Sequence, residues 1–247
     1  MINGKINHIY ELLMKKKNFI CIILAKHNSS GLPKKNIKSF YGKPLLYYTI
    51  KAVKESKIFD RIILSTDSKF LKNYAEKKGV DVPFLRPKRL ATKSSPAMES
   101  IQHALEWVKK YDKVYDYVQY IFPANPLIIS DDIKKGIKML IKKNCDMIIS
   151  LSENNKCSFT SNTLKKNLLI KNFYPKKYRL KNRQLMPKTY SINGTIYVGK
   201  WDIFYKKKDW LKQNVYAMIM PQNRSVDIDN YYDFEVAKLM YKLEKKK

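Results

Sequence analysis

The chain of 247 residues is poor in cysteine and contains no long apolar run. Its three cysteines, Cys21, Cys145 and Cys157, form no CxxC pair, so a disulfide framework is not expected and a cytoplasmic location is favoured. The apolar run over residues 18–25 is about half as long as a membrane-spanning helix. It leads into a polar loop with glycine, not into a small-residue cleavage site, which argues against a signal peptide. We therefore expect no membrane span.

Acidic residues and arginine are also scarce, whereas lysine is abundant. Lys and Arg together number 50 against 21 Asp and Glu, which gives a net charge of +29, but only six of the basic residues are arginine. Such a charge suits nucleic acid, an anionic membrane surface or an anionic substrate. Base readout favours arginine, and the chain has no aromatic–basic RNA motif and no zinc-finger spacing. We therefore expect no specific nucleic-acid partner.

Apolar periodicity predicts strands that alternate with helices. Helices are expected at residues 44–55, 69–79, 97–111, 130–143 and 231–245, and strands at 18–25, 61–66, 80–85, 115–122, 145–152, 192–199 and 215–221. Gly79 is expected to end the second helix, and Ser130 to cap the fourth. This alternation predicts an α/β fold with a mainly parallel sheet and helices on both faces. In such sheets, ligands bind beyond the carboxyl ends of the strands.

Two segments fall outside this pattern. Residues 1–17 are expected to form an N-terminal extension before a domain that covers residues 18–247. Residues 154–191 interrupt the alternation with a basic and aromatic sequence, including FYPKKYRLKNRQ. Its aromatic residues would be poorly buried in a simple α/β monomer, and aromatic side chains are enriched in interface cores. We therefore expect one domain with an insertion, and we expect two copies of the chain to form a homodimer through this insertion.

The loop AKHNSSGLPKKN, residues 25–36, follows the first predicted strand. It is neither a Walker A sequence nor a GxGxxG fingerprint. Backbone N–H groups at Ser29, Ser30 and Gly31 can still cradle phosphates, with Lys26 and Lys35 supplying positive charge. A solvated basic loop without a ligand is the alternative interpretation.

Asp227 and Asp229 form a DxD pair in an extended segment, so their carboxylates are expected on the same side. Two carboxylates near phosphates are suited to Mg²⁺, which prefers oxygen ligands. The alternative is that the pair caps the helix that follows, a role that Asp229 alone could fill.

Three further residues are candidates on weaker local grounds. Arg86 is one of the few arginines and lies between a predicted strand and a helix, while Arg183 and Tyr190 lie in the insertion. An anionic or polyhydroxylated ligand would suit Arg183 and Tyr190. Ordinary surface or interface roles are the alternative for all three.

Taken in chain order, several segments resemble the acylneuraminate cytidylyltransferases, or CMP-sialic acid synthetases. The family pattern A-R-x-x-S-K-G-L-P-x-K-N is matched at Ala25, Ser29, Gly31, Leu32, Pro33, Lys35 and Asn36. Further matches are GKPLLYYTI (42–50), FDR (59–61), STD (65–67), LRPKRLA (85–91), HALE (103–106), PANPL (123–127), NGTIY (193–197) and DIDNYYDFEVA (227–237). The resemblance extends over about residues 18–240.

The resemblance implies a Rossmann-like domain with a dimerisation segment, here residues 154–191. It also implies that CTP and a nonulosonate such as sialic, legionaminic or pseudaminic acid give a CMP-sugar and pyrophosphate with Mg²⁺, for surface glycans such as lipopolysaccharide or capsule. The implied nucleotide-binding residues are Ala25, Lys26, Ser29, Ser30, Gly31, Lys35, Asn36 and Arg86. Lys35, Asp227 and Asp229 are the implied catalytic residues, the two aspartates hold the metal, and Phe122, Arg183, Tyr190 and Asn193 lie near the sugar.

The chain departs from the family pattern at several positions, mostly at the sugar end. These are Lys26 for arginine, Ser30 for lysine, Lys93 for aspartate, Phe122, Asn125 and Ile128 for Gln, Ser and Arg, and Ser191 for arginine. Apolar Phe122 and Ile128 favour a deoxygenated sugar tail, unless both side chains turn into the core. A related enzyme that uses GTP or another sugar acid, and a non-catalytic nucleotide- or anion-binding protein, are the alternatives.

Overall fold

The computed structural model describes residues 16–29, 31–164, 166–206 and 209–246. Residues 1–15 of the expected N-terminal extension therefore lie outside the described residues. The centre of the molecule is a six-stranded sheet in the order β4-β1-β5-β7-β6-β8. Its strands are β1 (Phe19–Leu24), β4 (Arg61–Ser65), β5 (Tyr117–Ile121), β6 (Met147–Glu153), β7 (Tyr190–Lys200) and β8 (Val215–Met220).

All strand pairs of this sheet are parallel except those of β7, which runs antiparallel to both β5 and β6. The mainly parallel α/β sheet predicted from the sequence is thus confirmed. The expected strand at 80–85 is wrong, because Asp81 makes only an isolated bridge to Ile63. A small hairpin of β2 (Ser39–Phe40) and β3 (Lys43–Pro44) lies apart from this sheet.

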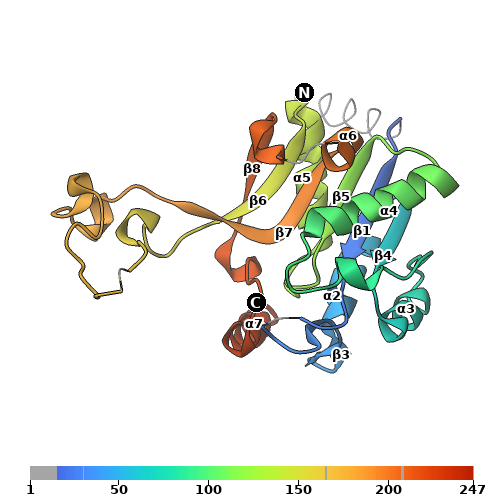
Figure 1. Cartoon of the computed structure of the whole chain (residues 1–247), viewed down its shortest axis with the longest axis horizontal. Helices are drawn as coiled ribbons and strands as arrows, with labels where there is room; N and C mark the ends of the chain where they lie inside the picture. Colours follow the sequence, from blue (N-terminus) through green and yellow to red (C-terminus); the bar gives the residue numbers. More distant parts are fainter. Residues whose placement is uncertain (1–15, 30, 165, 207–208, 247) are drawn as a thin grey trace.

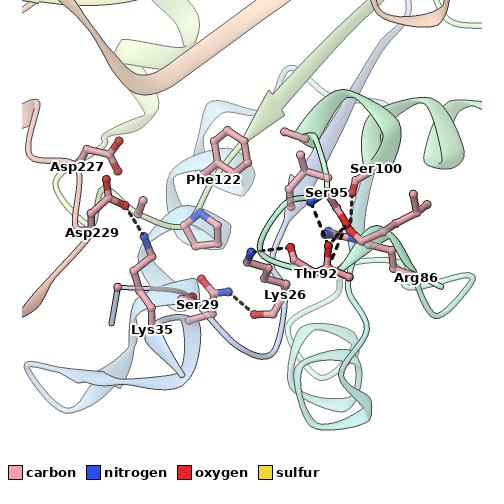
Figure 2. Close-up of a pocket in the computed structure, with 17 residues that line it drawn as sticks. Lys26, Ser29, Lys35, Arg86, Thr92, Ser95, Ser100, Phe122, Asp227 and Asp229 are labelled. Carbon is pink, nitrogen blue, oxygen red and sulfur yellow. Dashed lines mark hydrogen bonds and ion pairs between the residues drawn. The ribbon is translucent and has the colours of Figure 1, made fainter. Parts of the chain in front are cut away.

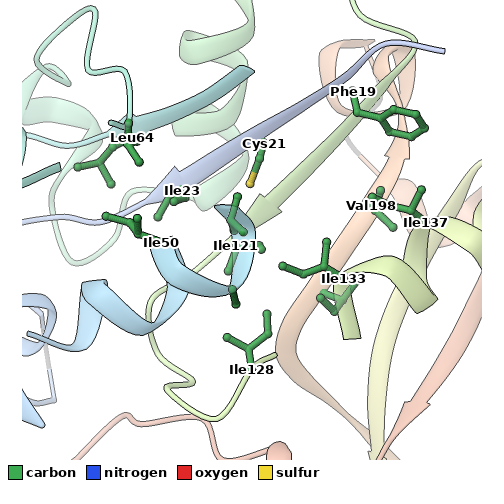
Figure 3. Close-up of a cluster of buried hydrophobic side chains, with 14 of the residues drawn as sticks. Phe19, Cys21, Ile23, Ile50, Leu64, Ile121, Ile128, Ile133, Ile137 and Val198 are labelled. Atoms are coloured by element: carbon green, nitrogen blue, oxygen red, sulfur yellow. The ribbon is translucent and has the colours of Figure 1, made fainter. Parts of the chain in front are cut away.

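Helices cover both faces of the sheet (Figure 1). Those that pack on one face are α2 (Leu45–Ser56), α3 (Lys69–Glu76) and α5 (Ser130–Lys143), and those on the other are α4 (Ala97–Tyr111) and α6 (Trp201–Lys206). Because β1 is covered on both sides, all six of its residues are buried, which explains its continuous apolar sequence. Figure 3 shows one half of this core, where Ile23 and Ile121 of the sheet meet Ile50 and Ile133 of the helices.

The helix ends follow local chemistry, with one correction. Gly79 has a φ of +69°, which suits the turn after α3. The expected N-cap at Ser130 is wrong, because Ile129 occupies that position and its N–H donates to Asp132 at 3.2 Å. The last helix, α7 (Tyr231–Glu244), packs Phe234 and Ala237 against Phe40 and Tyr48, and thereby fastens the C-terminal segment beside the loop after β1.

Residues 154–189 form an arm that projects from the sheet (Figure 1). The arm starts from the paired ends of β6 and β7, where Glu153 lies opposite Tyr190. It contains three short 3₁₀ turns, η3 (Ser158–Thr160), η4 (Lys176–Tyr178) and η5 (Arg183–Leu185). Its apolar side chains are largely exposed, namely Phe159, Leu164, Leu168, Leu169, Ile170, Leu180 and Leu185. The alternation of strands and helices is therefore interrupted at the arm.

Among the residues that the structure describes, no helix combines the length and apolar character needed to span a membrane.

Candidate nucleotide-binding site

A cavity of about 460 Å³ opens beside the carboxyl ends of β1 and β5, where a parallel sheet is expected to bind its ligand. It brings together residues from four distant parts of the sequence (Figure 2). The predicted site residues on its wall are Lys26, Ser29, Gly31, Lys35, Asn36, Arg86, Phe122, Asp227 and Asp229. Ala25 is buried at the end of β1 and does not line the cavity, and Ser30 lies outside the described residues.

Asp227, Asp229 and Lys35 form the charged end of the cavity. The ammonium of Lys35 donates to the carbonyl of Ile228 and lies 3.4 Å from Oδ1 of Asp229. No hydrogen bond to the carboxylate of Asp227 is found within the described part of the chain. This carboxylate opens onto the cavity, and Asp227 is an exposed residue. Partial desolvation by the surrounding protein and the negative charge of Asp229 raise the pKa of Asp227, against the opposing effect of Lys35.

The helix-capping interpretation of the two aspartates does not hold in the structure. The N-cap of α7 is Asn230, whose side chain accepts from the N–H of Asp233 at 3.0 Å. In return, the carboxylate of Asp233 accepts from the N–H groups of Asn230 and Asp229. Since neighbouring residues cap the helix, the carboxylates of Asp227 and Asp229 stay available to the cavity.

The loop after β1 is held by its own side chains and by the neighbouring strand. Asn36 is buried and donates to the carbonyl of Lys26 at 2.7 Å, while the N–H of His27 donates to Asp67 at 2.7 Å. The ammonium of Lys26 reaches across the cavity to the carbonyl of Thr92 at 3.2 Å. The described residues of this loop are therefore held in place by these bonds, with Lys26 at the edge of the cavity, an arrangement suited to a phosphate.

Arg86 lies at the other end of the cavity and is buried. Its Nε donates to the Ser65 hydroxyl at 3.0 Å, and its Nη2 donates to the Ser65 carbonyl. Desolvation lowers the pKa of Arg86 to about 10, with the charge of Asp67 acting in the opposite sense. The guanidinium is thus fixed by β4 and is not a surface group.

Sequence reasoning missed the hydroxyl groups beside Arg86. Thr92, Ser95 and Ser100 line this end of the cavity. The hydroxyl of Ser95 lies 2.6 Å from that of Thr92, and the hydroxyl of Ser100 donates to the Leu90 carbonyl at 3.1 Å. The signal was the run of small polar residues in TKSSPAMES (92–100), which directly follows the segment LRPKRLA. These hydroxyls add donors and acceptors suited to a polar ring.

The residues predicted near the sugar are not gathered in one place. Phe122 lines the cavity, whereas Tyr190 is exposed at the base of the arm and Asn193 is buried outside the cavity lining. The backbone of Arg183 belongs to η5 in the arm, and its side chain lies outside the described residues. Ile128 is buried in the core, so the alternative interpretation holds for this side chain.

A metal ion at the charged end would depend on few protein ligands. Within the described ranges, no group of three or more His, Cys, Asp or Glu side chains is placed to hold a metal ion. Asp227 and Asp229 provide two carboxylates at most. Mg²⁺ is usually held by one or two carboxylates together with substrate phosphates and water, so the donor set fits this ion.

Comparisons with known proteins agree with this geometry. The family model described as "Cytidylyltransferase" matches residues 20–245. The chain is 30% identical to a pseudaminic acid cytidylyltransferase of Campylobacter jejuni, over 91% of this chain and 96% of that protein. It is 32% identical to an N-acylneuraminate cytidylyltransferase of Escherichia coli O18:K1:H7, over 90% of this chain and 52% of that protein.

A solved structure shares the fold. The structure of a CMP:2-keto-3-deoxy-manno-octonic acid synthetase complexed with CTP covers 92% of this chain with a TM-score of 0.68 and 13% identity, and the match spans 99% of that protein. Together with the matched family model, these findings make this protein an enzyme of the nucleotidyltransferase type. The chain belongs to the cytidylyltransferase family.

Proposed function

We propose that this enzyme couples CTP to an α-keto sugar acid of the nonulosonic class, giving a CMP-sugar for surface glycan synthesis and releasing pyrophosphate. The relatives support the substrate class, because they are named for pseudaminic acid and N-acylneuraminate. The observation that carries the proposal is the cavity of Figure 2, with Lys35 and two aspartates at one end, a buried arginine with hydroxyl groups at the other, and Lys26 reaching toward those hydroxyl groups. A nucleoside triphosphate needs both environments, the charged one for its phosphates and the hydroxyl-bearing one for its nucleoside.

The reaction is a displacement at phosphorus. The anomeric hydroxyl oxygen of the sugar acid bonds to the α-phosphorus of CTP and loses its proton to solvent. The bond from the α-phosphorus to the bridging oxygen breaks, and pyrophosphate leaves with the electron pair. Lys26 and Lys35 lie on the cavity wall, where they neutralise phosphate charge and align the triphosphate. Arg86 and the neighbouring hydroxyls bind the nucleoside.

Asp227 and Asp229 hold Mg²⁺ in this proposal. The Asp227 carboxylate is open to the cavity and the Asp229 side chain is largely exposed, so both present oxygen atoms toward the phosphate end. When bound, the ion supplies positive charge that stabilises the phosphate oxygens during transfer. Lys35 lies beside the same carboxylates and keeps their joint negative charge partly compensated without substrate.

The sugar acid is a deoxygenated nonulosonate, of the legionaminic or pseudaminic kind. Phe122 provides an apolar wall to the cavity, packed edge-on against Tyr120 at a centroid distance of 5.7 Å. A buried hydroxyl without a partner costs roughly 1–3 kcal/mol. A buried methyl group gains about 0.8 kcal/mol. A tail that ends in a methyl group therefore suits Phe122 better than a glycerol tail.

The proposal includes a homodimer formed through the arm and a cytoplasmic location. The arm exposes apolar residues, such as Leu168, Ile170 and Leu180, that a second copy could cover. It has no acidic residue between positions 154 and 189, so its solubility depends on its lysines and arginines. Cys21, Cys145 and Cys157 are all free thiols, which fits a reducing compartment.

Pyrophosphate release tests the proposal. CTP, GTP, ATP and UTP are each combined with sialic, legionaminic and pseudaminic acids in the presence of Mg²⁺. We expect release with CTP and a nonulosonate, and a fall of about 10²-fold or more in Asp227→Asn, which removes a charged ligand with little change of shape. Asp202→Asn, at an exposed ion pair on α6, is the matched control. Turnover with GTP alone, or none with any pair, would favour one of the alternative functions.

A further inference from the structure

β7 contains a bulge directly beside the candidate site. Ile149 pairs with Tyr197 and Leu151 with Ile192, so two steps along β6 correspond to five steps along β7. The extra residues include Asn193 and Gly194. Bulges commonly lie beside active sites, where they change the direction of a side chain or of the backbone.

A buried hydrogen-bond network holds the bulge. The hydroxyl of Ser150 donates to Oδ1 of Asn193 at 2.5 Å and accepts from the N–H of Ile196 at 2.7 Å. The amide nitrogen of Asn193 donates to the Ser225 hydroxyl at 2.9 Å. Ser150 and Asn193 are buried, and both ends of the Asn193 side chain are engaged. Asn193 therefore ties the bulge to the segment that leads, two residues after Ser225, to Asp227.

Gly194 lies against the Asp227 carboxylate. Its φ is +69°, and a β-carbon at this position would be 2.7 Å from Oδ2 of Asp227. Real β-carbon contacts are never this short, so an alanine would displace the carboxylate. No hydrogen bond to this carboxylate is found among the described residues, so the close approach of Gly194 limits where the carboxylate can lie.

Gly31 lies against the backbone of the second aspartate. A β-carbon on Gly31 would overlap the backbone carbonyl oxygen of Asp229. This contact is with backbone, so it cannot be relieved by turning a side chain. The loop after β1 therefore approaches the DxD segment as closely as a residue without a side chain allows.

We propose that Gly194 and Gly31 are positioning residues that set the locations of the Asp227 and Asp229 carboxylates, with Asn193 and Ser150 holding the bulge that carries Gly194. This inference rests on the proposed function, in which the two carboxylates hold a divalent ion. It also gives Asn193 a structural role behind the cavity in place of contact with the sugar.

The test uses Mn²⁺ as a spectroscopic probe, with CTP present and the sugar acid omitted so that no turnover occurs. Mn²⁺ binding is followed by electron paramagnetic resonance in the wild type, Gly194→Ala and Gly31→Ala. Gly42→Ala is the matched control, because Gly42 has a φ of +77° with nothing within 4 Å of a β-carbon. It carries the backbone strain of Gly194→Ala without the contact. Unfolding temperatures are measured for all variants.

We expect Mn²⁺ affinity to fall about tenfold or more in Gly194→Ala and Gly31→Ala. Displacing a carboxylate ligand weakens the binding of an ion that, like Mg²⁺, requires near-ideal coordination geometry. Gly42→Ala should bind as the wild type does, even where its unfolding temperature drops. Combining Gly194→Ala with Asp227→Asn should weaken binding no further than Asp227→Asn alone, because the glycine acts through that carboxylate. Ser225→Ala should weaken binding in the same direction by a smaller factor, and it serves if Gly194→Ala does not fold.

Two outcomes are distinguishable. If Asp227→Asn weakens Mn²⁺ binding but Gly194→Ala and Ser225→Ala bind as tightly as Gly42→Ala, the positioning role is wrong and the proposed function stands. If Asp227→Asn itself leaves Mn²⁺ binding unchanged, the metal site of the proposed function is wrong.

Discussion

Lys35 and Asp229 face each other at the charged end of the cavity, with Nζ and Oδ1 3.4 Å apart. The lysine side chain is 14% exposed and the aspartate side chain 77% exposed. The lysine is thus anchored among protein groups, including the Ile228 carbonyl, while its partner opens to solvent. A buried, oriented cation beside an exposed carboxylate is well placed to exchange that partner for a phosphate.

Replacing Lys35 by methionine should impair nucleotide use. The substitution keeps the apolar stem and removes the charge. We expect kcat/KM for CTP to fall by about 10²-fold, the typical loss when one oriented donor to a developing anion is removed. Lys35→Arg should retain more activity, and Lys51→Met, at an exposed ion pair on α2, should change little. Equal activity of Lys35→Met and the wild type would refute the phosphate role.

As the pH is lowered, the activity should begin to fall at a higher pH than it would if the essential aspartate had an ordinary pKa. Desolvation and the charge of Asp229 raise the pKa of Asp227, so lowering the pH protonates this carboxylate early. Asp229→Asn removes the neighbouring negative charge and should move the acid limb to lower pH, although the maximal rate drops. Profiles of kcat/KM against pH check this. An acid limb that moves upward in Asp229→Asn would contradict the assignment.

Phe122 should determine the preference between sugar acids. We expect the wild type to have a higher kcat/KM for a 9-deoxy nonulosonate than for sialic acid. Phe122→Gln should shift this ratio toward the hydroxylated sugar by roughly tenfold, since one hydrogen bond to a buried hydroxyl amounts to about 1 kcal/mol or more. The ratio cancels any general loss of activity. An unchanged ratio would remove Phe122 from the sugar site.

Ser65→Ala should destabilise the protein through Arg86. The change leaves Nε of a buried guanidinium without its hydroxyl partner. We expect a loss of about 1–3 kcal/mol in the free energy of unfolding. For a chain of this size, each kcal/mol corresponds to a fall of roughly 2–4 °C in Tm. Thermal unfolding measures it, and a Tm equal to that of the wild type would show that the contact contributes nothing.

The arm should hold a homodimer together. Leu180 is 99% exposed, and replacing it and Ile170 by aspartate should give a monomer in light scattering at micromolar concentration. The wild type should be dimeric under the same conditions. Leu211→Asp is the control, because Leu211 is 66% exposed but lies outside the arm. A wild-type monomer, or a dimer that persists in the double variant, would exclude the arm as the interface.

Local patterns in the sequence were sufficient for most elements of the fold. The continuous apolar run of β1 and the helical periodicity of α4 and α5 directly reflect which side chains become buried, so these elements match their predicted positions closely. The strand expected at 80–85 failed because Val80 and Val82 are buried by packing against neighbouring helices, not by pairing in a ladder. Burial alone does not distinguish these two environments.

The candidate site was predicted in part. The loop of Lys26 and Lys35 follows a buried strand, and the DxD spacing suits a metal, so both were visible in the sequence. The hydroxyl groups around Thr92 were missed because serine and threonine are common in any loop. The positions of Asn193 and Tyr190 outside the cavity lining depend on the bulge and on the arm, which no local pattern encodes.

The sequence by itself determined the alternation of strands and helices, the excess of lysine and the family motifs. These properties are carried by composition and by spacing within short segments. Only the tertiary structure decided that Ser65 holds Arg86, that β7 enters the sheet antiparallel, and that Gly194 lies against Asp227. The physical reason is that such contacts join residues far apart in the chain. Their geometry is fixed by the order of the strands and by the packing of the helices, neither of which is expressed in any local stretch of sequence.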